Sequence, residues 1–243
     1  MRLYDLSHPL ETGMTVYPGS PPVEIGRTAT IESDGYATSR LELSSHTGTH
    51  MDAPAHMRPD GDTIEAIDLE RFRFRAVVAD CRPLEPRTPI DENRLTEAVT
   101  VSETALETAS LLLCYTGWAE YWGTDRYFEH PYLTADAGDW LVANDLDLGI
   151  DALNVDPTPG ADDDDSGPND EGPGTNDESS GTNDEEPGTY PFHQTMFEAD
   201  RLLLENLRGL EALPTDAVFE VQAFPLAVAD GDGSPVRAVA VVD

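Results

Sequence analysis

Core strands are the clearest prediction from the pattern of apolar and polar positions along this chain. The apolar runs FRAVVADC at 74–81 and ASLLLCYTG at 109–117 are typical of such strands. The segment ATSRLELSSH at 37–46 alternates polar and apolar residues, as a half-buried strand does. The same reasoning predicts further strands at 149–156, 218–228 and 236–243.

Segments with helical spacing of apolar residues separate these strands. They predict helices at 63–72, 89–99 and 132–145, with Thr134 as a candidate N-cap of the last one. Strands and helices interleave, and some strands follow one another directly, so the predicted fold class is α/β with a mixed sheet. The 243 residues suffice for one large domain or two small ones.

The segment 160–188 breaks this pattern. It contains almost no apolar residue and no basic one, and it carries an irregular GTNDE repeat. Such a composition cannot bury enough apolar surface to offset the entropy lost on ordering. We therefore predict a disordered acidic insertion in a surface loop. Calcium binding is the less favoured alternative, because the ligand spacing of an EF-hand loop is missing.

The charge of the chain limits its partners. The formal net charge is -34 at pH 7, and all 14 cationic residues are arginine. This charge repels nucleic acids and anionic membranes, so neither is an expected partner. An acidic, lysine-free composition is typical of a very salty cytoplasm such as that of a haloarchaeon, where ions screen self-repulsion. We find no signal peptide and no apolar run that could span a membrane, so a cytoplasmic protein is expected.

The segment SSHTGTHMDAPAHM at 44–57 concentrates candidate chemistry. It holds three of the six histidines and an aspartate, at even spacing: His46, His50, Asp52 and His56. In an extended strand, side chains at this spacing leave on one side. A straight strand would carry His56 about 33 Å from His46, so the chain must bend, and Gly48 and Pro54 permit a bend.

Imidazole and carboxylate ligands together suit zinc, manganese or iron. Four such ligands are enough for one catalytic ion with a residue to spare, or for two ions completed from elsewhere in the chain. Asp52 could bridge two ions, because a carboxylate has two oxygens. The segment therefore predicts a metal site.

The same residues carry a family resemblance. HTGTHMDAPAH at 46–56 resembles the H-x-G-T-H-x-D-A-P-x-H signature of the metal-dependent cyclase-like hydrolases, the family of bacterial kynurenine formamidase and isatin hydrolase. YDLSHPLETGMTVYPG at 4–19, GIDALNVD at 149–156 and GSPVRAVAVV at 233–242 are similar to further family segments. The resemblance implies a swivelling β/β/α fold over one domain, 1–243, usually oligomeric. It also implies that a metal-activated water attacks an amide, ester or lactone.

The resemblance also implies roles for particular residues. His46, His50 and Asp52 become ligands of a first ion, and His56 becomes the proton donor and acceptor. The later histidine and glutamate that the family requires are His193 and Glu205, in FHQTMFEADRLLLENL.

An unbroken helix would separate His193 from Glu205 by about 18 Å, so the helix must end between them, and 197–201 is the expected place. Tyr17 stands where the kynurenine formamidases carry a tryptophan that packs on the substrate's aryl ring. Because of this difference, the sequence does not identify the substrate. His8 and His130 each precede a proline, and we expect structural hydrogen bonds from them.

The leading functional hypothesis is a metal-dependent hydrolase of a small amide, ester or lactone, with His56 as general acid and base. One alternative is a lyase or cyclase that acts by elimination or ring closure, and another is a non-catalytic metal-binding protein. Zinc and manganese both suit the ligands, with one or two ions per chain. We also expect the protein to act on a small-molecule substrate and to form a homo-oligomer, either a dimer or a tetramer.

Overall fold

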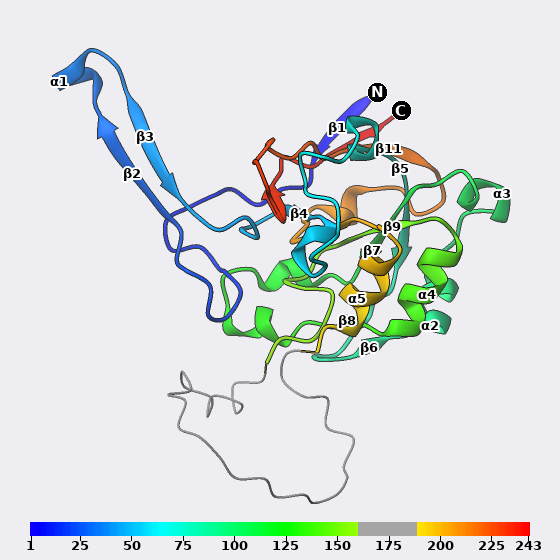
Figure 1. Ribbon diagram of the computed structural model, residues 1–243. Helices are drawn as coiled ribbons and strands as arrows, with labels where there is room; N and C mark the ends of the chain where they lie inside the picture. The colour runs from blue at the N-terminus through cyan, green and yellow to red at the C-terminus, as the bar shows by residue number, and fades with distance from the viewer. Residues whose placement is uncertain (160–188) are drawn as a thin grey trace, which may run out of the picture.

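The computed structural model describes residues 1–159 and 189–243, so the insertion predicted at 160–188 lies outside the described residues. Within the described ranges, nine strands form one sheet in the order β1-β13-β11-β5-β7-β9-β10-β4-β12 (Figure 1). The strands are β1 (Arg2–Asp5), β4 (His50–Asp52), β5 (Arg73–Asp80), β7 (Leu111–Tyr115), β9 (Asp147–Ile150), β10 (Leu203–Glu205), β11 (Phe219–Gln222), β12 (Gly233–Pro235) and β13 (Val239–Val242).

The sheet is mixed, as predicted. β5, β7, β9 and β10 run parallel to their neighbours in that group, and the outer strands pair antiparallel. Every residue of β7 and β9 is buried, which is typical of central strands in a sheet covered on both faces. The predicted core strands at 74–81 and 109–117 are therefore confirmed, and so is the α/β class.

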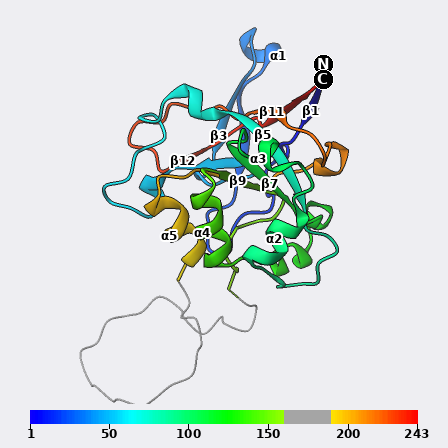
Figure 2. The same cartoon turned by 90° about the vertical axis from the view of Figure 1, so that its right-hand side faces the viewer.

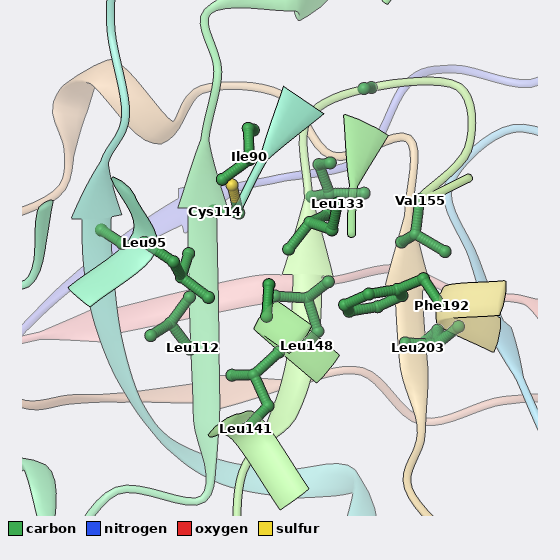
Figure 3. Close-up of a cluster of buried hydrophobic side chains, with 14 of the residues drawn as sticks. Ile90, Leu95, Leu112, Cys114, Leu133, Leu141, Leu148, Val155, Phe192 and Leu203 are labelled. Atoms are coloured by element: carbon green, nitrogen blue, oxygen red, sulfur yellow. The ribbon is translucent and has the colours of Figure 1, made fainter. Parts of the chain in front are cut away.

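Helices α2 (Glu92–Ala98), α4 (Ala135–Ala143) and α5 (Pro191–Glu198) cover one face of the sheet (Figures 1 and 2). Figure 3 shows Leu141 of α4 and Phe192 of α5 among Leu112, Leu148 and Leu203 of the strands. A second apolar cluster fills the opposite face. This packing fixes α5, and with it His193, against the sheet.

The remaining elements are short. They are α1 (Ile31–Asp34), α3 (Glu103–Leu106), the strand pair β6 (Pro89–Ile90) and β8 (Tyr132–Leu133), and the 3-10 helices η1 (Pro54–His56), η2 (Leu69–Phe72), η3 (Trp118–Tyr121), η4 (Asp125–Glu129) and η5 (Leu210–Ala212). In the described part of the chain, no helix has the length and apolar character needed to cross a membrane.

Several sequence predictions of secondary structure were wrong in type or extent. The strand predicted at 218–228 ends at Gln222, and the helices predicted at 89–99 and 132–145 begin as the strands β6 and β8. The segment 63–72 is not an α-helix, because the Ile64 N–H donates to the Gly231 carbonyl at 2.8 Å and only its end is helical, as η2. The strand predicted at 149–156 ends at Ile150. The chain leaves the sheet there because the buried Asp151 carboxylate accepts hydrogen bonds from the N–H groups of Thr116 and Gly117.

Strands β2 (Glu24–Ala29) and β3 (Thr38–Glu42) form a hairpin arm, tipped by α1, that projects from the body of the protein (Figure 1). The predicted strand at 37–46 is therefore correct in type. Its predicted half-burial is wrong, because every residue of β3 is exposed. The polar and apolar residues alternate along a strand of the arm, which the nine-stranded sheet does not cover.

His8 and His130 are both buried. The His8 ring stacks on Trp122 with 3.8 Å between ring centroids, and His130 Nδ1 donates to the Pro131 carbonyl at 2.8 Å. The Nε2 atom of each ring is buried without a hydrogen-bond partner among the described residues. Burial lowers the pKa of both imidazoles from 6.5 to about 4.

These two histidines predict acid sensitivity. Between about pH 6.5 and pH 4 these two histidines are protonated in the unfolded chain but not in the folded protein, so their contribution to the free energy of unfolding falls as the pH falls through that window. The expected loss is about 1.4 kcal/mol per pH unit for each histidine. Urea unfolding at constant salt measures it. His8→Phe keeps the stacking on Trp122 and should flatten the pH dependence; equal slopes in parent and variant would contradict the account.

Candidate metal centre

The histidine cluster follows a bent path. His50 and Asp52 both lie in β4, two residues apart, so their side chains share one face. His46 precedes the strand in a turn, and Gly48 adopts the left-handed conformation with φ +60° between them. His56 ends the 3-10 helix η1, which begins at Pro54. Both bends predicted from the sequence are present.

The second segment of the site joins the first through the sheet. Helix α5 ends at Glu198 and β10 begins at Leu203, so the break predicted between His193 and Glu205 is confirmed. β10 pairs antiparallel with β4, and Glu205 stands directly opposite His50. Opposite residues on paired strands share a face, so the pairing brings the two segments together.

The ligand atoms of these residues converge around the Asp52 carboxylate. Asp52 Oδ1 lies 2.6 Å from His46 Nδ1 and 3.1 Å from His50 Nε2. On the other side, His193 Nε2 lies 3.7 Å from both Asp52 Oδ2 and Glu205 Oε1. Two groups that could hold an ion therefore share Asp52, each with ligand atoms within 4.8 Å of one another: His46, His50 and Asp52, and Asp52, His193 and Glu205.

Hydrogen bonds at Nδ1 orient the rings of His50 and His193. The Asp156 carboxylate accepts from the backbone N–H groups of Phe192 and His193 at 3.0 Å, and Nδ1 of His193 lies 2.6 Å from it. Nδ1 of His50 donates to the Gly48 carbonyl at 2.8 Å. Each ring therefore turns its Nε2 toward Asp52 and Glu205, the arrangement expected of metal-binding histidines.

The electrostatics of the cluster favour a cation. Asp52 and Glu205 are only 1% and 3% exposed. Burial, reinforced by the Asp52 carboxylate, raises the pKa of Glu205 to about 7. Burial alone would lower the pKa of His193, but hydrogen bonds to Asp156 and Asp52 raise it to about 10. Among the described residues that line the cavity here, none is arginine, so the carboxylates lack a permanent positive partner. A divalent ion fits this donor set.

The cluster forms the floor of a cavity of about 410 Å³, a size that suits a small molecule. Tyr17 and Tyr190 form one wall, with their hydroxyl oxygens 3.5 Å apart. The structure brings every site residue predicted from the sequence to this cavity: Tyr17, His46, His50, Asp52, His56, His193 and Glu205.

Sequence reasoning missed two acidic residues in contact with the cluster. Asp156 supports His193, and Asp232 Oδ2 lies 3.0 Å from His46 Nε2. The chain has 48 acidic residues, so composition does not distinguish these two. Their positions were a signal: Asp156 ends GIDALNVD, and Asp232 directly precedes GSPVRAVAVV.

Comparison with known proteins identifies the family. Residues 4–157 match the family described as "Putative cyclase". The chain belongs to this cyclase family. It is 30% identical over 241 residues to the kynurenine formamidase of Paracidovorax citrulli, which covers 98% of this chain and 95% of that protein. The kynurenine formamidase of Bacillus cereus is 29% identical over 238 residues, covering 97% and 95% of the two chains.

Solved structures of cyclase-family proteins share the fold. Isatin hydrolase A from Ralstonia solanacearum aligns with a TM-score of 0.78 at 23% identity, over 100% of this chain and 92% of that one. These relatives confirm the resemblance carried by HTGTHMDAPAH and the predicted cyclase-like α/β fold.

Proposed function

We propose that this protein is a metal-dependent hydrolase of a small amide, with esters and lactones as related substrates. The observation that carries the proposal is the pair of ligand groups sharing Asp52 on the floor of a cavity that fits a small molecule. Relatives named kynurenine formamidase, and structural neighbours named isatin hydrolase, support the amide class.

The proposed ligands fall into two sets. His46, His50 and Asp52 would hold a first ion, and His193, Glu205 and the second oxygen of Asp52 would hold another. Nitrogen and oxygen donors suit both zinc and manganese, with one or two ions per chain. When bound, such an ion polarises a carbonyl oxygen and lowers the pKa of a water molecule.

We assign proton transfer to His56. Its side chain is 28% exposed, more than that of His46, His50 or His193. It belongs to neither group that shares Asp52, and the third group of possible ligands, His46, His56 and Asp232, is the most exposed of the three. The His56 ring lies next to that of His46, with 3.9 Å between centroids, and it lines the cavity. There it accepts a proton from water and passes it to the leaving nitrogen.

We propose that Tyr17 and Tyr190 contact the substrate. Both residues line the same cavity as His56, and aromatic rings stack on planar groups. The favoured substrate is therefore a small arylformamide or a cyclic aryl amide.

The proposal predicts a specific loss in His56→Gln. We expect kcat/KM on a panel of arylformamides and cyclic aryl amides to fall about 10²- to 10⁴-fold, because general acid–base catalysis typically contributes that much. Bound metal should stay at the parent level. Asp60→Asn, an exposed neighbour on the same loop, is the control. Unchanged turnover in His56→Gln would remove this residue from the mechanism, and products without solvent oxygen in ¹⁸O-water would favour the elimination alternative.

We also propose a homo-oligomer, with the hairpin arm as the contact. Ile31, Tyr36 and Leu41 on the arm are 72%, 61% and 53% exposed. Among the described elements, β2 and β3 pack closely only against each other, and a two-stranded hairpin alone is marginally stable in water. A second copy related by a two-fold axis would cover both arms at once.

The arm predicts a change of mass on mutation. In high salt, Tyr36→Asp with Leu41→Asp should reduce the mass measured by light scattering to that of a single chain, because charge on the apolar face opposes its burial. Leu69→Asp, at an exposed leucine on the body, is the matched control. A parent that is already monomeric, or a double variant with the parent's mass, would contradict the proposal.

A cytoplasmic location and a salt-rich host are likewise proposals. They rest on the net charge of -34 and the lysine-free composition.

A further inference from the structure

We propose that Asp232 is a positioning residue for the metal centre. Its carboxylate accepts the Nε2 proton of His46 and thereby turns Nδ1 of that ring toward Asp52. The inference rests on the proposed metal-dependent function. It gives a role to the C-terminal segment, which lies outside the residues that match the family.

His46 needs such a partner because no strand holds it. The residue lies in the turn before β4, and its side chain is 20% exposed, whereas those of His50 and His193 are 3% and 2% exposed. Its two ring nitrogens face two different carboxylates: Nδ1 lies 2.6 Å from Asp52 Oδ1, and Nε2 lies 3.0 Å from Asp232 Oδ2.

An imidazole that binds a metal ion through Nδ1 offers a lone pair on that atom and keeps its remaining proton on Nε2. The Asp232 carboxylate lies where it accepts this Nε2 proton of His46. Asp232 therefore selects the tautomer of His46 that binds a metal ion.

The other two histidines follow the same rule. His193 uses Nδ1 to bond Asp156, His50 uses Nδ1 to bond the Gly48 carbonyl, and each leaves Nε2 for the cluster. A partner on the non-ligating nitrogen fixes both the tautomer and the ring orientation of a ligand histidine. Asp232 supplies that partner for His46.

The backbone around Asp232 is shaped to receive the His46 ring. The Asp232 carbonyl accepts from the Ala53 N–H at 3.0 Å, which ties the residue to the end of β4. The next residue, Gly233, begins the edge strand β12 beside β4. A Cβ atom at Gly233 would lie 2.8 Å from His46 Cε1 and 2.8 Å from the Met51 carbonyl oxygen, so only glycine admits the ring here.

Asp232 also lies beside the proposed proton carrier. Its Oδ2 is 3.6 Å from His56 Nδ1, too far for a direct hydrogen bond but close enough for an ionic contact. Activity alone would therefore not separate an effect on His46 from one on His56. The decisive measurement is metal binding.

The test uses Co²⁺ titrated into the metal-stripped full-length protein, followed by the visible absorption of the bound ion and by competition with a chelator. Asp232→Ala removes the acceptor, whereas Asp232→Asn keeps a neutral acceptor oxygen. We expect the affinity for Co²⁺ to fall by about 10- to 100-fold in the alanine variant, with an altered absorption band, and to recover partly in the asparagine variant. Circular dichroism checks that both variants fold.

Asp230→Asn is the matched control. Asp230 is exposed on the same loop, two residues earlier, and its φ of +54° is one that asparagine tolerates. The control should bind Co²⁺ like the parent. If Asp232→Ala also binds like the parent, with the same absorption band, the positioning role is overturned while the proposed function stands. If the parent itself binds no Co²⁺, the proposed metal centre fails, and this inference with it.

Discussion

The structure depends on one electrostatic constraint: Asp52 and Glu205 are buried next to each other with only imidazoles to balance them. Burying unpaired carboxylates is costly, so the carboxylates favour the charged form of the imidazoles beside them, and the pKa of His193 rises to about 10. Protonation of Glu205, whose pKa is raised to about 7, is one way to reduce the cost. Binding of a divalent cation by the same atoms is another, because the cation attracts both carboxylates and offsets the repulsion between them.

The rest of the fold serves to hold these groups together. The antiparallel pairing of β10 with β4 places Glu205 opposite His50, and the first turn of α5 brings His193 Nε2 to 3.7 Å from Asp52 Oδ2. The Asp156 carboxylate forms hydrogen bonds both to the backbone of the first turn of α5 and to His193 Nδ1. One carboxylate therefore fixes the position of the helix and the orientation of the imidazole. The parallel strands β5, β7 and β9 provide the rigid core behind the site.

Much of this was predictable from the sequence. The even spacing from His46 to His56, the bends at Gly48 and Pro54, and the helix break before Glu205 follow from residue types and chain geometry. The central strand β7 follows from an uninterrupted apolar run, since such a run must be buried on both faces.

Other features could not be read from local pattern. The apolar residues of 63–72 have helical spacing, but Ile64 bonds to Gly231, far away in the sequence. The alternation of polar and apolar residues in β3 did not indicate that this strand belongs to an exposed arm. Such alternation shows which residues share a side of the strand, but it does not show whether other elements cover that side. Asp232 contacts His46 across 186 positions, a proximity that only the β4–β12 pairing creates.

The most direct test of the account is elemental analysis of the protein purified in high salt, with the His193→Ala variant beside it. We expect about one or two zinc or manganese ions per parent chain, with one or both lost in His193→Ala together with activity, because the two distant segments form one centre. A parent that carries no metal and binds none on addition would contradict the central claim.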